Sequence, residues 1–382
     1  MPFIVYLLAA CIFSMTTSEF MVAGMMPSLA ADFAVPLPDI GNLVSAFAAS
    51  VVIGGPVLTV LLRRVARKTV LQILLLVFCV GQVIAATATG YPAMMASRVI
   101  SGVAQSAFFG TAMALIAGRV GLERMGRASS VVLGGLMLSS VAGLPMATLI
   151  DQHVGWRANF WLVAALTFAC GLAIGLSTPK DPAPGHEPLR RQLAALAGGP
   201  LWAAYASSAL IIGAVFAAFT YFTPIFTTLS GFEPVSVPWL FAVYGVATVA
   251  GTAITGRFAD RHTREVLTAG LVCLSAIFAI FALGAASRSL TLACVLVVGL
   301  AGLPMNPAMV TRVLRVADGS ALVNAMHMAV INLGLMAGSY LGGMLIDRGL
   351  GLTAPLWLGS AIAMAGLASL WPLWRRRAAT AA

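Results

Sequence analysis

Residues 69–89 read TVLQILLLVFCVGQVIAATAT, a run of 21 residues without a charged side chain. A helix needs about 20 mainly apolar residues to cross the hydrocarbon core of a bilayer, so this stretch alone predicts a spanning helix. Four basic residues stand immediately before it, namely Arg63, Arg64, Arg67 and Lys68. Lys and Arg gather in the cytoplasmic loops of membrane proteins, so we expect this helix to start on the cytoplasmic side.

The whole chain shares this apolar character. It has 382 residues, of which 60% are hydrophobic and 9% are charged, and its mean hydropathy is +0.99. Soluble globular domains carry about 25% charged and roughly 45–50% apolar residues. The composition therefore excludes a water-soluble enzyme or a nucleic-acid-binding protein as the main interpretation, and it predicts an all-α protein embedded in the lipid bilayer.

Twelve apolar stretches of spanning length follow one another along the chain. An even number of spans places both termini on one side of the membrane, and 18 of the 22 lysines and arginines then lie on that side. The positive-inside rule assigns this side to the cytoplasm. The net charge of +10 therefore reflects topology and gives no reason to expect nucleic acid as a partner. The expected spans are 4–29, 39–62, 69–89, 92–118, 127–150, 157–177, 200–229, 236–256, 265–286, 289–311, 320–346 and 353–373.

The two halves of the chain repeat each other at a nearly constant offset. Pro27 and Pro224 are 197 residues apart, and the aspartates of two Leu-Ile-Asp motifs, Asp151 and Asp347, are 196 apart. The stretch between the halves is rich in Pro, Gly and charge, which is typical of a linker. We therefore expect two pseudo-symmetric six-helix bundles and a cytoplasmic linker, with boundaries at 1–177, 178–199 and 200–382.

A loop motif points to a known superfamily. The segment 256–264 reads GRFADRHTR and resembles the Gly-x-x-x-Asp-Arg-x-x-Arg signature of the major facilitator superfamily. In the first half, Arg63 stands where the family usually has Asp, and only the basic character of that loop is kept. The resemblance implies that substrate binds between two rocking bundles. It also implies a conformational latch; a plain solvated loop is the alternative, and the residues concerned are Arg64, Asp260, Arg261 and Arg264.

Further motifs resemble the twelve-span drug:proton antiporters, and among them the bacterial chloramphenicol efflux proteins and the related arabinose-type exporters. These motifs are TSEF at 17–20, Arg98 with Gly102 and Gly110, GRASSVVLGG at 126–135, AGLP at 142–145 and GWRANFW at 155–161. In the fifth span, Gly143 allows close helix approach and Pro145 bends the helix, so both are candidates for a conformational switch. Ordinary helix packing also explains the glycines, but together with the proline they favour export over uptake.

Glu19 is the one acidic residue expected within the membrane, because the other eleven lie in loops or at span ends. It lies about 15 residues from the start of its span, or roughly 22 Å at 1.5 Å per residue. A carboxylate at such a depth costs at least ~2.5 kcal/mol when ionised, so this group can both hold and release a proton. We predict that Glu19 is the proton carrier; a permanently protonated packing residue is the alternative.

Arg98 is the one strongly basic residue expected inside a span, at a depth comparable to that of Glu19. The resemblance implies that both of their helices line the central cavity. We therefore predict that Arg98 is coupled electrostatically to Glu19, directly or through water, and favours release of its proton. The alternative is a structural role, in which Arg98 snorkels or caps backbone carbonyls.

Several side chains are candidates for substrate contact. Met15 and Met26 share a helical stripe with Glu19, and methionines suit an irregular apolar drug, although ordinary packing is the alternative. In the second half, aromatic and polar side chains of the seventh and eleventh spans can stack on a substrate or hydrogen-bond to it. They are Phe219, Tyr221, Asn324, His327 and Asn332.

These residues predict an inner-membrane exporter that exchanges a small hydrophobic drug for protons, with both termini cytoplasmic. The resemblance to phenicol efflux proteins makes chloramphenicol the first substrate to test. An exporter of a sugar or another small metabolite is the alternative. A membrane-embedded enzyme is disfavoured, because the spans offer no set of positioned catalytic groups. The sequence lacks a phosphate-binding GxxxxGK[ST] motif and metal-ligand spacing. We therefore expect no cofactor or metal, a proton gradient as the energy source, and a monomer.

Overall fold

The computed structural model describes residues 2–120, 122–177, 194, 196–317 and 321–370, and these residues form helices joined by short connections. Eleven of the helical stretches are long and apolar enough to cross a membrane. A twelfth apolar helix, Ala354–Ser369, is shorter. The expected all-α membrane fold of twelve helices is therefore confirmed. Most of the expected linker at 178–199, and everything after residue 370, lies outside the described residues.

Over its described residues, the N-terminal half forms eight α-helices and two short irregular helical segments. Helix α1 runs the length of the bundle and is followed by the short α2. The later helices run alternately between the two ends of the bundle. Their bounds are α1 Phe3–Gly24, α2 Met26–Phe33, α3 Leu37–Leu61, η1 Leu62–Arg64, α4 Arg67–Ala86, α5 Tyr91–Val120, α6 Leu122–Leu138, η2 Ser139–Gly143, α7 Leu144–Val154 and α8 Trp156–Ser177.

The C-terminal half repeats this pattern with more interruptions. Its elements are α10 Gly199–Phe219, α11 Phe222–Pro224, η3 Ile225–Leu229, η4 Pro234–Ser236, α12 Val237–Ala259, α13 Thr263–Gly284, α14 Arg288–Ala301, η5 Leu303–Met305, α15 Asn306–Leu314, α16 Ala321–Leu345, η6 Ile346–Leu350 and α17 Ala354–Ser369. We call the end where α8 finishes and α10 begins the linker end, and the opposite end the α2 end.

Three spans expected as single helices are interrupted, at Met25, at Thr220–Tyr221 and at Gly302. In each case a proline follows within four residues, at Pro27, Pro224 or Pro304. Proline has no amide hydrogen to donate and its ring clashes with the preceding turn, so the helix stops and restarts around it.

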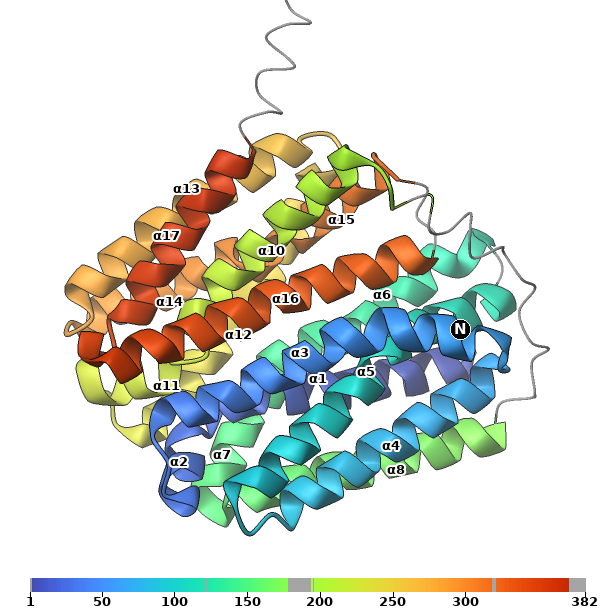
Figure 1. The fold of residues 1–382 in the computed structure, drawn as a ribbon, viewed down its shortest axis with the longest axis horizontal. Coiled ribbons are helices and arrows are strands. Elements are labelled where there is room, and N and C mark those ends of the chain that lie inside the picture. Colours follow the sequence, from blue (N-terminus) through green and yellow to red (C-terminus); the bar gives the residue numbers. More distant parts are fainter. Residues whose placement is uncertain (1, 121, 178–193, 195, 318–320, 371–382) are drawn as a thin grey trace, which may run out of the picture.

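Helices α3 and α16 lie side by side along the middle of the molecule, with α4, α5 and α8 on one side and α10, α13 and α17 on the other (Figure 1). Small residues permit such close packing within the halves as well. A Cβ atom on Gly334 of α16 would lie 2.1 Å from the carbonyl oxygen of Ala209 on α10. Glycine at this position therefore allows the two backbones to touch, as is common between membrane helices.

The outer surface of the bundle carries large apolar side chains. Leu176 is 81% exposed and Leu283 is 78% exposed. Such side chains have no favourable place in water, whereas lipid tails solvate them at no cost. Their exposure fits a protein whose perimeter faces a bilayer.

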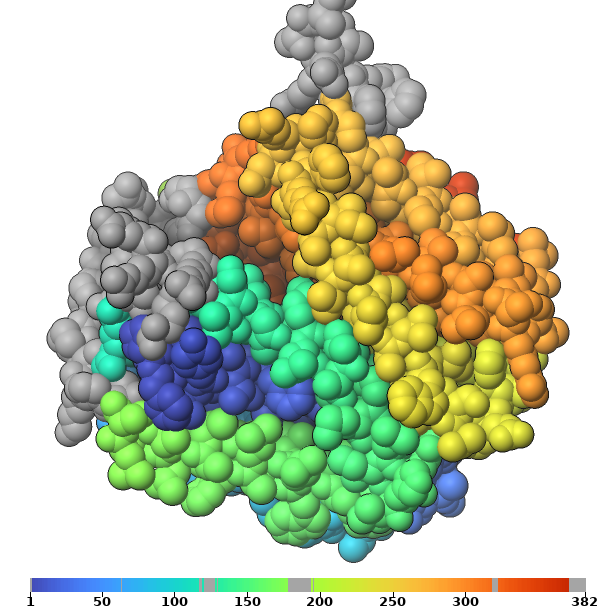
Figure 2. Space-filling model, turned by 180° about the vertical axis from the view of Figure 1, so that it is seen from behind, coloured from blue at the N-terminus to red at the C-terminus, as the bar shows by residue number. Residues whose placement is uncertain are grey.

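The two halves are joined by hydrogen bonds on the α2 side of the molecule. Thr223 Oγ1 donates to the carbonyl oxygen of Ala23 at 2.7 Å, and Ser339 Oγ donates to that of Gly41 at 3.1 Å. Toward the linker end the surface is hollowed between α6, in teal, and the orange part of the C-terminal half (Figure 2). The halves therefore pack along α3 and α16, and at the α2 end hydrogen bonds also join them.

Candidate functional site

Glu19 lies in the last third of α1, next to a glutamine of α5. Its Oε2 atom accepts a hydrogen bond from Nε2 of Gln105 at 2.6 Å. An amide can hydrogen-bond to a carboxylate through its NH2 group or to a protonated carboxyl through its oxygen. The contact therefore suits either protonation state of Glu19.

Arg98 lies on α5 with only 1% of its surface exposed. Its guanidinium donates to the carbonyl oxygen of Ser18 at 3.0 Å, to the Ser18 hydroxyl at 3.3 Å and to the carbonyl oxygen of Glu19 at 3.4 Å. It also lies 4.3 Å from the ring centroid of Phe47 on α3. The buried cation is thus held by main-chain dipoles, a hydroxyl and an aromatic face.

Arg98 and Glu19 therefore meet, but through the main chain of Glu19. These contacts are those of the alternative interpretation, in which the arginine caps backbone carbonyls. The guanidinium nevertheless brings its charge close to the helical turn that carries the Glu19 carboxylate. Electrostatic coupling between the two side chains stays a prediction.

A buried polar network connects this arginine to α4. Ser18 Oγ donates to Oε1 of Gln82 at 2.9 Å, and Nε2 of Gln82 donates to Ser101 Oγ at 2.9 Å. Gln82 has no exposed surface. Buried polar groups that satisfy one another fix the relative positions of their helices. The network thus holds α1, α4 and α5 in register around Arg98.

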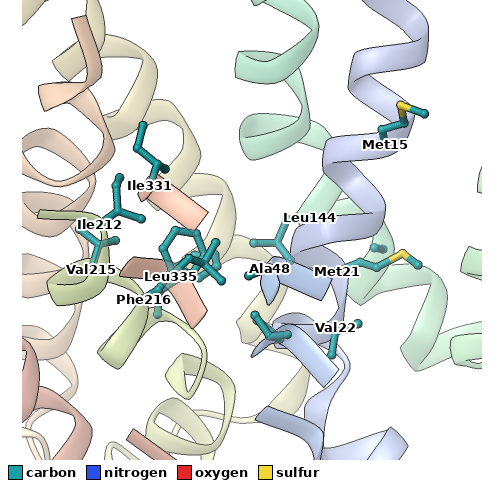
Figure 3. Packing of buried hydrophobic residues seen from close by; sticks show 14 of the residues in the cluster. Met15, Met21, Val22, Ala48, Leu144, Ile212, Val215, Phe216, Ile331 and Leu335 are labelled. Carbon is teal, nitrogen blue, oxygen red and sulfur yellow. The ribbon is translucent and has the colours of Figure 1, made fainter. Parts of the chain in front are cut away.

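The C-terminal half faces this region with aromatic side chains. Phe20, which follows Glu19, lies 5.8 Å from Phe216 and 6.0 Å from Phe219 between ring centroids. Phe219 in turn lies 5.2 Å from Tyr244 of α12. In Figure 3, Phe216 is on the side of its half that faces the N-terminal half. The interface between the halves therefore has an aromatic wall beside Glu19.

The two methionines predicted as substrate contacts lie in the protein interior. Met15 is 1% exposed and Met26 is fully buried, and both belong to the hydrophobic core. Met15 points away from the C-terminal half in Figure 3. Their packing accounts for both side chains, which is the alternative that the sequence left open.

The other predicted substrate contacts are dispersed. Tyr221 is fully buried at the α2 end, where its hydroxyl donates to the carbonyl oxygen of Ser339 at 3.0 Å. His327 is 3.0 Å from the Ser208 hydroxyl and stacks on Tyr205 at a centroid distance of 5.7 Å. Asn324 is exposed near the linker end.

Several buried polar atoms have no hydrogen-bond partner among the described residues, and two of them belong to Asn332 and Tyr244 of the C-terminal half. Asn332 is 5% exposed and donates to the carbonyl oxygen of Met328 at 3.0 Å, but its Oδ1 atom has no partner. The hydroxyl of Tyr244, which is 1% exposed, has none either. Unsatisfied buried groups cost free energy, so they are candidates for contact with a ligand or water.

The predicted switch residues of the fifth span lie at a π-helical turn of a continuous helix. The π-helical segment Ser139–Gly143 separates α6 from α7, and Pro145 lies in the first turn of α7. A Cβ atom on Gly143 would lie 2.2 Å from Thr17 Oγ1 on α1. The glycine thus allows close approach to the helix that carries Glu19.

The predicted latch lies at the linker end. Asp260 accepts a hydrogen bond from the Thr311 hydroxyl at 3.2 Å, and its carbonyl oxygen accepts one from Arg315. Arg264 forms an ion pair with its neighbour Glu265 at 3.1 Å. Asp260 therefore connects α12 to α15 within one half. The remaining two latch candidates, Arg64 and Arg261, are exposed.

The sequence analysis overlooked Gln105, Gln82 and Arg312. Gln105 follows Arg98 by seven residues, which puts both on one face of a helix, and this spacing could have revealed it. Arg312 was assigned to a loop, but it lies in α15, is 8% exposed and donates to the Ser207 hydroxyl. Among the described residues, no three His, Cys, Asp or Glu side chains gather as a metal site would require.

Comparison with known proteins assigns the family. A family model described as Major Facilitator Superfamily matches residues 8–318 and 231–382. The chain belongs to this superfamily. Its members are transporters, so the chain is a major facilitator transporter and the expected resemblance is confirmed.

Related major facilitator proteins come from several bacteria. A chloramphenicol resistance protein of Streptomyces lividans is 32% identical over 343 residues, which cover 88% of each chain. The inner membrane transport protein YdhP of Escherichia coli is 30% identical over 90% of this chain and 88% of its own. The putative transporter AraJ of Escherichia coli is 26% identical over 90% of this chain and 88% of its own.

Proposed function

We propose that this transporter exports a small, mostly apolar drug in exchange for protons, with Glu19 as the proton carrier. The observation that carries the proposal is the 2.6 Å hydrogen bond between Glu19 Oε2 and Gln105 Nε2. A carboxylate engaged in a buried ion pair is held in its ionised form. A carboxylate bonded to a neutral amide can instead take up and release a proton.

The neighbourhood of Glu19 suits a drug with an aromatic or apolar body. Phe20, Phe216 and Phe219 pack at centroid distances of 5.3 to 6.0 Å where the two halves meet. Ligand sites are commonly lined by such side chains and by a few polar groups that set orientation. The unpartnered oxygens of Tyr244 and Asn332 can supply such groups.

Transport then follows from rocking of the halves. The proton binds Glu19 from one side of the membrane and the drug binds from the other side. Each of the two stabilises a different conformation of the transporter. Each ligand shifts the equilibrium only by its difference in affinity between the two states. Exchange requires that proton and drug oppose each other at Glu19.

Chloramphenicol is the first substrate to test, because a related protein that covers most of this chain is named a chloramphenicol resistance protein. We also propose an inner-membrane location with both termini cytoplasmic. The distribution of basic residues supports that orientation. A monomer that uses the proton gradient and no cofactor completes the proposal.

The test is chloramphenicol accumulation in cells that express the wild type, Glu19→Gln or Glu233→Gln at equal levels, with and without a protonophore. Glu233 is exposed in the connection before α12, so its variant makes the same chemical change outside the site. Wild type and Glu233→Gln should lower accumulation until the protonophore is added. Glu19→Gln should not, because Gln keeps the shape of Glu but cannot titrate.

The outcomes separate the parts of the proposal. Uphill export by Glu19→Gln would place proton coupling at another residue. Unchanged accumulation with well-expressed wild type would exclude chloramphenicol and turn the search to other drugs and to sugars.

A further inference from the structure

Gln105 is partly buried on α5 and uses only one end of its amide. Its Nε2 atom donates to Glu19 Oε2 at 2.6 Å, whereas its Oε1 atom is buried and has no partner among the described residues. A buried carbonyl oxygen without a donor is unfavourable. The opposite end of this amide is therefore available to a group that the protein does not itself provide.

The protonation state of Glu19 determines which end of the Gln105 amide, the oxygen or the NH2 group, is left without a partner. An ionised carboxylate only accepts hydrogen bonds, so it requires the NH2 group of Gln105 and leaves the oxygen free. A protonated carboxyl has an O–H to donate. It can bond to the amide oxygen once the amide turns over, and the NH2 group is then the free end.

We infer that Gln105 is a positioning residue that converts the protonation state of Glu19 into a choice between a hydrogen-bond acceptor and a donor for the substrate. This inference rests on the proposed function. With Glu19 ionised, Oε1 of Gln105 accepts from an N–H or O–H group of a substrate. Protonation of Glu19 withdraws that oxygen, and the substrate is released.

The inference specifies a substrate class. The ligand carries an amide or hydroxyl donor next to an apolar or aromatic body, because Phe20 adjoins Glu19 and contacts the ring of Phe216 at 5.8 Å. A substrate with acceptors alone gains nothing from the free oxygen. Such a substrate should not oppose protonation through Gln105.

Arg98 is the charged group that contacts α1 at the level of Glu19. The other charged residues on elements packed against α1 lie toward the ends of those elements. They are Asp39 on α3, Arg119 on α5, Glu123, Arg124 and Arg127 on α6, Asp151 and His153 on α7, and Arg157 on α8. On the further helices packed against α5, Arg67 and Lys68 lie at the start of α4, and His327 of α16 is held by Ser208 and Tyr205 of α10. A pH dependence that requires both Glu19 and Gln105 is therefore assigned to this pair.

The experiment measures binding of radiolabelled chloramphenicol to the purified full-length protein from acidic to alkaline pH. Gln105→Met keeps an unbranched side chain of similar size and removes both amide groups. Gln72→Met makes the same change on α4, outside the site. Thermal unfolding of each variant checks that the fold is intact.

Wild type and Gln72→Met should bind more tightly as pH rises. Gln105→Met should bind about tenfold more weakly at alkaline pH, as expected for one lost hydrogen bond to a polar ligand group, and its affinity should vary little with pH. Glu19→Gln should also show affinity that varies little with pH.

Two results would overturn different claims. If Gln105→Met keeps the wild-type pH dependence while Glu19→Gln loses it, the role of Gln105 is wrong and Glu19 remains the proton carrier. If Glu19→Gln keeps the pH dependence, the proposed function itself fails.

Infrared difference spectra of the ligand-free protein provide a readout that needs no drug. Acidification of the wild type should shift a glutamine amide carbonyl band together with the appearance of a protonated carboxyl band. Both changes should be missing in Glu19→Gln, and Gln105→Met should keep only the carboxyl band. An unchanged amide band in the wild type would refute the reorientation of Gln105.

Discussion

Replacement of Gly41 by Ala should open the α2 end of the transporter. The Tyr221 hydroxyl lies against Gly41 of α3, and a Cβ atom there would be 2.1 Å from the Tyr221 oxygen and 2.9 Å from Cζ. The same hydroxyl donates to the carbonyl oxygen of Ser339, and Ser339 Oγ donates to that of Gly41. Tyr221 thus occupies a notch that exists only while the two halves touch.

The size of the effect follows from these contacts. Overpacking a filled site costs about 1–3 kcal/mol, and loss of the hydrogen bond to Ser339 adds about 1 kcal/mol. The closed state of the α2 end should therefore lose about 2–4 kcal/mol. This corresponds to a shift of roughly 30-fold to 1000-fold in the equilibrium between closed and open.

Spin labels at Gln152 and Val235 measure this opening, because the two residues lie on opposite halves at the α2 end. Nε2 of Gln152 donates to the carbonyl oxygen of the neighbouring Pro234 at 2.5 Å. Gly41→Ala should move the distance distribution to longer values and slow transport. Gly110→Ala is the matched control, since a Cβ atom there would meet nothing within 4 Å.

A second substitution tests the cause. Tyr221→Leu removes the atoms that the new methyl group would meet, so it should restore closure to Gly41→Ala in a double-mutant cycle. A Gly41→Ala protein with the wild-type distance distribution would refute the argument. So would a double variant that opens as far as Gly41→Ala alone.

Arg98→Lys should lose about 1–3 kcal/mol of stability and most proton-coupled transport, because one ammonium group cannot reach both carbonyl oxygens that the guanidinium binds. Thermal unfolding and transport assays measure the two losses, and a variant that keeps full stability and full transport would contradict the prediction. Tyr244→Phe should leave the unfolding midpoint unchanged or slightly higher, because it removes a buried hydroxyl without a partner. Because this hydroxyl is a proposed polar contact for the drug, drug binding should weaken about fivefold to tenfold in an affinity titration. Unchanged affinity would remove Tyr244 from the site.

Much of the architecture was predictable because it depends on composition and periodicity. The twelve apolar stretches and the repeat offset follow from the requirements of a bilayer and of tandem halves. The interruptions at Met25 and Gly302 were missed, although Pro27 and Pro304 mark them. A hydropathy profile does not show such breaks, because proline and glycine lower the mean hydropathy much less than a charged residue does.

The site was predictable only in part. Glu19 and Arg98 stand out because an ionisable group inside a membrane is costly. Their partners do not stand out, because the carbonyl oxygens bound by Arg98 belong to every residue type and Gln105 is uncharged. These contacts depend on the side of the helix from which each side chain projects. The depth of a residue in the membrane, which the sequence does give, does not specify that side.

The contacts of Arg98 also bear on how the chain enters the membrane during synthesis. Its hydrogen-bond partners belong to Ser18 and Glu19 of α1, and the network that supports them includes Gln82 of α4. All three residues precede Arg98 in the sequence, so they leave the ribosome first. When α5 inserts into the lipid, the hydrogen-bond acceptors for Arg98 are already in the membrane. Insertion of α5 therefore does not depend on synthesis of the C-terminal half. If the gene is rearranged so that α5 is synthesised before α1, Arg98 should lack hydrogen-bond acceptors in the membrane, and α5 should insert less efficiently.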